Sequence, residues 1–178
     1  MTQAVRRTTM RSLVLAAALA TTGVGSARAD ELKVGDRLAE LDTAVDAAGK
    51  PFRLKALKSK WTMITFGALW CKPCAKELPA WDKLAPDWKA KVSFIVVDLD
   101  SETASGKKFH DGLKLKNMVR VYLSPDSATA AKYGSDHMPT TLLADDKGVI
   151  RYVRGGFEKG DVAGEVKKMR DELTKLVK

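Results

Sequence analysis

The feature that most restricts the fold of this chain is the segment at residues 64–81, ITFGALWCKPCAKELPAW. It contains both cysteines of the protein, Cys71 and Cys74, with two residues between them. An apolar run at residues 61–66 leads into this segment, and apolar residues at helical spacing follow the second cysteine. The pattern predicts that a strand ends shortly before Cys71 and that a helix begins at about Cys74.

The start of a helix favours a reactive thiol. Its unpaired N–H groups and the positive end of the helix dipole stabilise a thiolate, which is the nucleophilic form of cysteine. We therefore expect Cys71 to be the nucleophile and Cys74, one turn into the helix, to resolve a mixed disulfide formed on Cys71. A purely structural disulfide is disfavoured, because closing a loop of about four residues removes only about 2 kcal/mol of unfolded-state entropy. The residues thus indicate a redox site or a site for a soft metal ion.

Residues 1–29 have the pattern of a secretory signal. Three arginines form a basic start, residues 13–20 are an unbroken apolar run, and the sequence Ala27-Arg28-Ala29 places small residues at the two positions that an export peptidase reads. We expect cleavage before Asp30. The apolar run is shorter than the roughly 20 residues of a membrane span, and an uncleaved anchor that extends to Gly25 is the alternative.

The remaining chain, residues 30–178, is expected to form one domain, since a chain of 178 residues with 45% hydrophobic content can bury one core. The leader carries four of the 31 basic residues and none of the 22 acidic ones, so the mature chain has a net charge of +5. Its surface is modestly basic and has no basic and aromatic cluster, which argues against nucleic acid as a partner. Outside the cytoplasm thiols are under oxidising pressure, so a redox-active pair there needs an electron source or sink.

Strands and helices alternate along the mature chain. After an extended lead-in with a turn at Ala48-Gly49 and one helical turn at residues 56–60, we expect strands at residues 61–66, 92–97, 119–123, 140–144 and 149–153, and helices at residues 74–89, 103–115, 124–133 and 161–177. Ser101 or Thr103 is expected to cap the second helix. His110 is expected to be solvated on this polar helix, and Asp98 and Asp100 to serve as strand-end and capping residues. This order predicts a three-layer α/β domain.

With these motifs in place, the chain resembles the thioredoxin fold, and more closely the exported thioredoxin-like disulfide reductases of the TlpA/ResA type. FGALWCKPC matches the tryptophan-preceded CxxC, Pro79 falls five residues after Cys74 as in thioredoxins, and MPTT at residues 138–141 matches the cis-proline strand. The lead-in, with Gly35 and Gly49, resembles that family's N-terminal hairpin. The resemblance implies an α/β thioredoxin-like fold with a central mixed sheet and an N-terminal β-hairpin extension.

The resemblance also assigns site residues. It implies that the Met138–Pro139 peptide bond is cis, that this loop and Thr140 lie beside the sulfurs and bind an incoming peptide, and that Trp70 borders the site. Thioredoxin has a buried acid six residues before its first cysteine, where this chain has Thr65.

A different residue must then accept the proton of Cys74. Glu77, three residues after Cys74, matches a glutamate that the TlpA/ResA group carries near its active site, and we predict that it assists proton transfer. The alternative is a surface glutamate favoured by the helix dipole.

The function implied is that of a periplasmic thiol:disulfide oxidoreductase, most simply a reductase of protein disulfides that needs no cofactor. Its expected partners are disulfide-containing clients, such as apocytochromes in cytochrome c maturation, and a membrane-associated thiol reductant. We expect a monomer.

Two other functions occur on this fold. A copper(I) carrier would use Cys71, Cys74 and His137 with Met138 close by, since thiolate, imidazole and thioether suit this soft ion; the copper-assembly relatives, however, have a CxxxC spacing. Thiol peroxidases place a threonine or serine three residues before the reactive cysteine, where this chain has Ala68.

Overall fold

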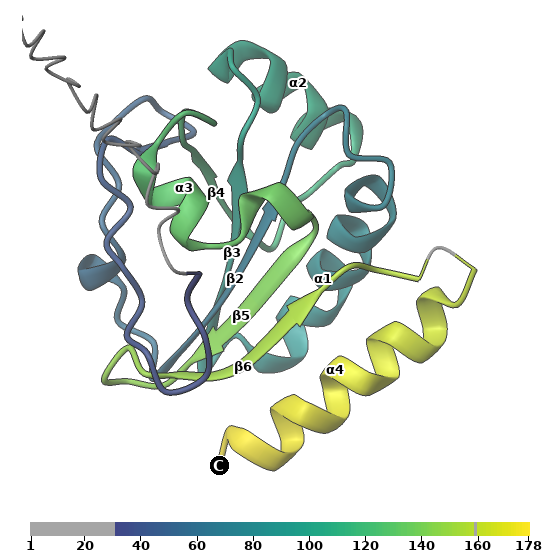
Figure 1. Cartoon of the computed structure of the whole chain (residues 1–178). Helices are drawn as coiled ribbons and strands as arrows, with labels where there is room; N and C mark the ends of the chain where they lie inside the picture. Colours follow the sequence, from purple (N-terminus) through teal and green to yellow (C-terminus); the bar gives the residue numbers. More distant parts are fainter. Residues whose placement is uncertain (1–30, 159) are drawn as a thin grey trace, which may run out of the picture.

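The computed structural model of the protein describes residues 31–158 and 160–178. The predicted leader and its cleavage site lie outside these residues. Within the described part, none of the helices combines the length and the apolar character that a membrane crossing requires. The chain forms a six-stranded mixed sheet in the order β1-β4-β3-β2-β5-β6, with helices on both faces (Figure 1).

The strands and helices follow the alternation predicted from the sequence. The strands are β1 (Val45–Asp46), β2 (Trp61–Gly67), β3 (Val92–Asp98), β4 (Val119–Tyr122), β5 (Thr140–Ala144) and β6 (Ile150–Gly155). The helices are α1 (Cys74–Trp88), α2 (Thr103–Gly112), α3 (Ala128–Lys132) and α4 (Val162–Leu176), with 3-10 turns η1 (Leu54–Ala56) and η2 (Ser135–His137). Strands β2, β3 and β4 are parallel, whereas β5 and β6 run antiparallel to their neighbours. The predicted thioredoxin-like fold is confirmed.

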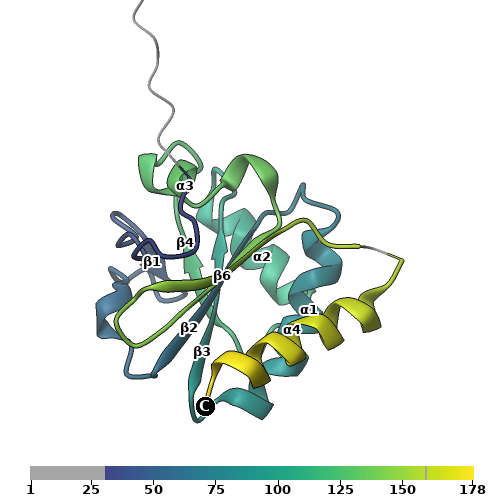
Figure 2. The same cartoon turned by 60° about the horizontal axis from the view of Figure 1, so that its bottom comes forward.

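Two apolar layers cover the sheet. Successive strand residues point to opposite faces, so Met63 and Val96 face α1, α2 and α4, while Ile64 and Ile95 face α3 and the lead-in. Because the central strands are buried on both faces, they are continuously apolar rather than alternating. Helix α4 packs along α1 (Figure 2). The junction of β2 and α1, which carries the two cysteines, therefore lies between the sheet and the packed helices α1 and α4.

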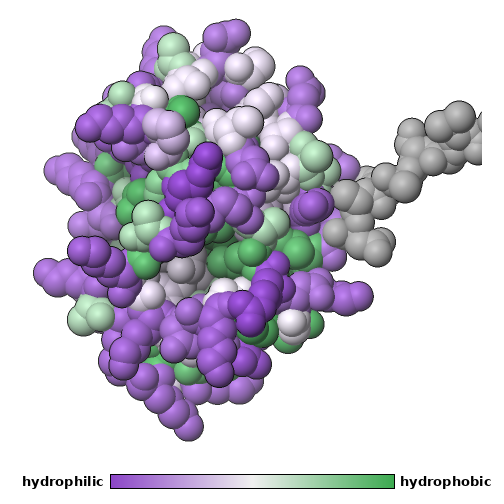
Figure 3. All heavy atoms as spheres, turned by 90° about the vertical axis from the view of Figure 1, so that its left-hand side faces the viewer, coloured by the Kyte–Doolittle hydropathy of each residue, from purple (hydrophilic) through white to green (hydrophobic). Residues whose placement is uncertain are grey.

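The lead-in before η1 covers the other face and forms only a minimal hairpin. Strand β1 is two residues long, pairs antiparallel with β4, and makes a single bridge from Val45 to Pro51. The Asp46 carboxylate accepts the N–H groups of Ala48 and Lys50 and so fixes the turn. Figure 3 looks onto this side, where hydrophobic surface (green) stays visible between hydrophilic residues (purple).

Some element boundaries differ from the prediction. The helical turn expected at residues 56–60 lies instead at η1. Helix α2 ends at Gly112, three residues early, because Lys114 adopts a positive φ of 56°. The predicted cap of α2 is also wrong: Glu102 takes the N-cap position, with no capping hydrogen bond from its side chain to the described residues.

The predicted solvent exposure of His110 is wrong. Its side chain is fully buried, with Nε2 3.5 Å from Oδ2 of the equally buried Asp98, and its ring lies against that of Tyr122. Gly106, on the same helix face, allows this approach, since a Cβ there would collide with the Asp98 carboxylate. Burial raises the pKa of Asp98 to about 7 and lowers the pKa of His110 to about 4, so burial favours the form in which both side chains are neutral.

Candidate active site

The two cysteines lie at the junction of β2 and α1, as predicted, and are joined in a disulfide. Pro73 precedes the helix, where its missing N–H is of no consequence, and its carbonyl accepts the N–H groups of Lys76 and Glu77. The N–H of Cys74 lies 3.3 Å from Sγ of Cys71 and donates to it. The helix start thus directs a hydrogen-bond donor at the sulfur predicted to be the nucleophile.

The two sulfurs differ in accessibility. Cys71 retains 4% exposure, whereas Cys74 has none, with its Sγ 3.9 Å from the carbonyl oxygen of Phe66. Gly67 lies directly behind the pair, and a Cβ there would come within 3.3 Å of the Cys74 Cβ. The more accessible sulfur is therefore that of Cys71, and Cys74 is shielded behind it.

The surface next to Cys71 is apolar and open. Trp70 is 66% exposed, and the loop that carries it is fixed by the Asp100 carboxylate, which accepts the N–H of Leu69 at 3.0 Å. A surface cavity of about 320 Å³ adjoins it, and its lining residues are Trp70, Leu99, Pro125, Ser135, Asp136 and Met138. Trp70 and Met138, both predicted to contact substrate, therefore share one cavity although they are far apart in sequence.

The loop before β5 has the predicted cis peptide bond between Met138 and Pro139. Pro139 is buried, and its carbonyl accepts the N–H of Gly156. Thr140 is also buried, with its hydroxyl 3.0 Å from the carbonyl oxygen of Gly134. The Thr140 side chain thus holds the loop in place.

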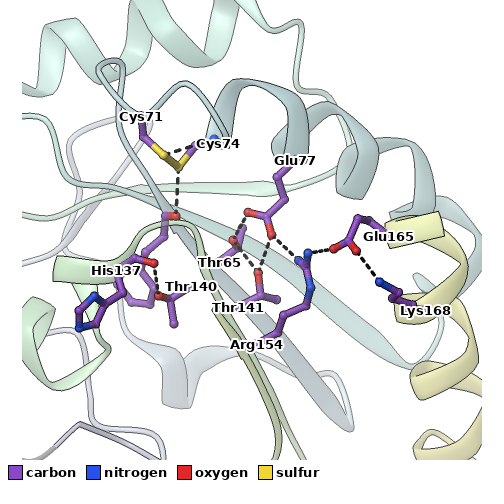
Figure 4. A network of polar contacts seen from close by, with 11 residues as sticks. Thr65, Cys71, Cys74, Glu77, His137, Thr140, Thr141, Arg154, Glu165 and Lys168 are labelled. Atoms are coloured by element: carbon purple, nitrogen blue, oxygen red, sulfur yellow. Dashed lines mark hydrogen bonds and ion pairs between the residues drawn. A yellow bond between two sulfur atoms is a disulfide. The ribbon is translucent and has the colours of Figure 1, made fainter. Parts of the chain in front are cut away.

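His137 does not approach the sulfurs. Its imidazole points away from the disulfide (Figure 4), is 67% exposed, and lies 3.6 Å from the Glu31 carboxylate. Across the parts of the chain that the structure describes, no group of three or more His, Cys, Asp or Glu side chains is arranged to bind a metal ion. The copper(I) carrier therefore stays a prediction without an observation in its favour.

Glu77 is fully buried beneath the active-site helix rather than exposed on it. Its Oε2 accepts a hydrogen bond from the hydroxyl of Thr65 at 3.1 Å, and its Oε1 accepts hydrogen bonds from Thr141 and Arg154, both at 3.1 Å (Figure 4). Burial raises the pKa of Glu77 to about 7, against the opposing effect of the Arg154 charge. The surface alternative for Glu77 is excluded. The Glu77 carboxylate therefore lies next to Thr65, which occupies the sequence position of the buried acid of thioredoxin.

The polar partners of Glu77 form one row across the sheet. Thr65 on β2 is the register partner of Thr141 on β5, which is in turn the register partner of Arg154 on β6. Arg154 also forms an ion pair with Glu165 in the first turn of α4, and Glu165 forms a second ion pair with Lys168 at 2.9 Å. Sequence reasoning missed Thr141, Arg154 and Glu165, since no local pattern shows that strand register brings them to Glu77.

Comparisons with known proteins agree with this geometry. A family model described as the AhpC/TSA family matches residues 34–153. Thiol-disulfide oxidoreductase ResA of Bacillus thuringiensis (strain Al Hakam) is 34% identical over 126 residues, which cover 70% of this chain and 72% of that protein. Thioredoxin-like protein YneN of Bacillus subtilis (strain 168) is 30% identical over 109 residues, which cover 61% of this chain and 64% of that protein.

Solved structures share the fold. A putative thiol:disulfide interchange protein DsbE from Chlorobium tepidum superposes with a TM-score of 0.67 at 24% identity, over 80% of this chain and 99% of that one. The pneumococcal exposed lipoprotein thioredoxin Etrx1 from Streptococcus pneumoniae strain TIGR4 superposes with a TM-score of 0.56 at 26% identity, over 73% of this chain and 98% of that one. Taken with the family match and the ResA relatives, these likenesses show that the chain belongs to the AhpC/TSA family, as a ResA-like thiol-disulfide oxidoreductase of thioredoxin fold with a CxxC pair.

Proposed function

We propose that the protein is an extracytoplasmic reductase of protein disulfides. The observation that carries this proposal is the asymmetry of the cysteine pair. Cys71 is the more exposed of the two, at 4% against none, accepts a hydrogen bond from the N–H of Cys74, and directly follows Trp70, which lines the cavity together with Met138. Cys74 is buried behind it. One sulfur is suited to meet a client disulfide and the other to react only with its neighbour.

The reaction proceeds in two exchanges. The Cys71 thiolate attacks one sulfur of the client disulfide, which forms a mixed disulfide and releases the first client thiolate. Cys74 then loses its proton and attacks Sγ of Cys71, which closes the Cys71–Cys74 disulfide and releases the second client thiolate. Two electrons pass from the dithiol to the client, and both client sulfurs end as thiols.

Glu77 is the proposed acceptor for the Cys74 proton. A group whose pKa lies near 7 is suited to this exchange at neutral pH. Cys74 carries a proton only in the reduced protein, so the proton transfer to Glu77 takes place in that state. In the oxidised protein the Glu77 carboxylate contacts Thr65, Thr141 and Arg154. Glu77 lies one helical turn further along α1, on the same side as Cys74.

The proposed setting is the periplasm. The signal-like pattern at residues 1–29 supports it, as does the likeness to proteins described as a secreted disulfide oxidoreductase from Mycobacterium tuberculosis and as an exposed lipoprotein thioredoxin. A reductase outside the cytoplasm must be recharged, so its electron donor is a membrane-associated thiol reductant. The clients are proteins with accessible disulfides, for which apocytochromes are the first candidates.

Trapping of the mixed disulfide tests the roles of the two cysteines. Cys74→Ser leaves the nucleophile without its resolving partner, so it should accumulate covalent, thiol-sensitive complexes with oxidised model proteins. Cys71→Ser should form none, since Cys74 is buried. Non-reducing electrophoresis followed by mass spectrometry detects the complexes, and accumulation with Cys71→Ser alone would reverse the assignment.

A further inference from the structure

The row of polar side chains beneath α1 continues beyond Glu77 to the surface of the protein. Nη1 of Arg154 lies 3.1 Å from Oε1 of Glu77, while Nη2 of the same guanidinium contacts Oε2 of Glu165. Lys168 then pairs with Glu165 and reaches solvent. Figure 4 shows the four side chains as one line from the active-site helix to α4. Their charges alternate in sign, so the row is neutral when Glu77 is ionised.

Arg154 is held rigidly in this row. Its side chain is only 12% exposed, and its guanidinium lies 5.8 Å from the ring centre of Trp81 and 5.2 Å from that of Phe157. The planar guanidinium presents two N–H edges to two different carboxylates, an arrangement that the single ammonium of lysine does not reproduce. Arginine also keeps its charge at every relevant pH. The row therefore supplies a fixed positive charge beside a buried acid.

This fixed charge favours the ionised form of Glu77. The charged and titratable groups on this side of the protein are Arg154 and Tyr152 from β6, Glu165, Lys168 and Glu172 from α4, and Cys74 from α1 itself. Strands β2 and β5 contribute the hydroxyls of Thr65 and Thr141. Burial alone favours the protonated acid, and the charge of Arg154 is the largest effect that opposes burial. Loss of Arg154 should therefore raise the pKa of Glu77 and lower the fraction of Glu77 that is able to take the proton of Cys74 at neutral pH.

We propose that Arg154 is a positioning residue of the active site: its guanidinium, clamped between Glu77 and Glu165, favours the ionised form of Glu77 and directs the carboxylate beneath the active-site helix, where it accepts the proton of Cys74. Glu165 serves the same end by fixing the guanidinium from the other side. This inference rests on the proposed role of Glu77 and extends it to a residue 77 positions away in sequence.

The test compares Arg154→Gln with the parent in two measurements on the reduced protein. Carbon NMR of the Glu77 carboxyl group gives its pKa directly. A nitrothiophenyl disulfide gives the kinetics, because it releases one coloured thiolate when Cys71 attacks and a second when Cys74 resolves the mixed disulfide. Loss of a neighbouring opposite charge raises a carboxyl pKa by about one unit or more. The second release should then slow about fivefold at pH 7, as the ionised fraction falls from about one half to about one tenth, and should recover as the pH rises.

Three variants make the comparison specific. Arg151→Gln removes an exposed arginine of the same strand, paired with Asp145 at 2.7 Å, and should leave both measurements unchanged. Arg154→Lys keeps the charge and should restore part of the pKa shift. Arg154→Gln with Glu165→Gln avoids a buried Glu165 that has lost Arg154 and keeps only its partly exposed pair with Lys168, so this double variant serves if Arg154→Gln alone fails to fold.

The outcomes separate the two proposals. The role of Arg154 is supported if Arg154→Gln raises the Glu77 pKa and shifts the pH profile for release of the second coloured thiolate to the same extent. A Glu77 pKa unchanged in folded Arg154→Gln overturns it, even if Glu77→Gln alters the second release as the proposed function requires. If Glu77→Gln leaves the pH profile of the second release as in the parent, the proposed role of Glu77 fails, and the inference about Arg154 falls with it.

Discussion

The protonation state of Glu77 affects both the proposed proton transfer and the stability of this protein. An acid buried in apolar surroundings costs stability when it is ionised, and the cost is reduced only by groups that stabilise the carboxylate. Here those groups are the Arg154 guanidinium and two threonine hydroxyls. The balance leaves Glu77 able to exchange a proton near neutral pH.

The stability of the oxidised protein should therefore depend on pH through Glu77. Its pKa rises from 4.5 to about 7 on folding, so between these values the folded protein holds a proton that the unfolded chain has released. Stability from this source is full below about pH 4.5, falls as the pH rises to about 7, and stays lower above it, by about 3 kcal/mol in all.

Glu77→Gln removes this dependence. Urea unfolding of the oxidised parent and variant at pH 5 and pH 8 provides the measurement. The loss of stability between these two pH values should be smaller in the variant by about 2.5 kcal/mol, because pH 5 already lies above the unfolded-state pKa. All other groups are common to the two proteins and cancel in the comparison. Equal losses in the parent and the variant would show that Glu77 does not titrate in this range.

The sequence predicted those site residues that belong to short motifs and missed those that reach the site only through the fold. Cys71 and Cys74 were predicted from a short motif, and the cis bond before Pro139 from the family resemblance; the structure shows the cysteine pair where β2 meets α1 and a cis bond at Pro139. Arg154 carries no such signal, because an arginine near a strand end is ordinarily a solvated residue. His110 was misread because the polar composition of α2 hides a narrow buried face.

At the scale of elements, α2 shows how one glycine sets the distance between a helix and the sheet. Gly106 lies against the Asp98 carboxylate at the end of β3, and that carboxylate also accepts the N–H of Asp100 at 3.0 Å. Asp100 in turn holds the loop of Trp70 through the N–H of Leu69. The packing of α2 therefore supports the loop that borders Cys71.

Two glycine substitutions on α2 separate this packing from helix propensity. Gly106→Ala places a methyl group against a short, buried and hydrogen-bonded carboxylate, so it should destabilise the protein by about 1–3 kcal/mol. At Gly112 an added Cβ would meet no described atom within 4 Å, so Gly112→Ala should be neutral or stabilising by up to about 1 kcal/mol. Thermal or urea unfolding gives both values, and a stabilised Gly106→Ala would contradict the described packing.

The order and type of the main elements were predictable because the apolar periods are strong, in particular for β2, β3 and α4. Short elements were not. Neither η1 nor α2 begins with a side-chain cap from the described residues, and the end of α2 depends on the positive φ at Lys114. The two-residue β1 is a strand only because β4 is present to pair with it.

At the scale of the whole molecule, the active site occupies the edge at which the parallel strands end. Strand β2 leads to Cys71, β3 ends at Asp98, and the loop before β5 returns Met138 to the same edge. Ligands of open α/β sheets bind at this edge. The fold thus assembles the site from segments far apart in sequence, and α4 closes its underside through Glu165.

The direction of electron flow is the central claim of this account, and the equilibrium reduction potential of the Cys71–Cys74 couple tests it most directly. Redox titration of the purified protein against glutathione or dithiothreitol buffers gives the value. As a reductase the protein should have a potential below about −200 mV, near the roughly −270 mV of thioredoxin. A potential near about −120 mV would mean that the dithiol form is unusually stable, which contradicts a reductase and indicates an oxidant of client thiols.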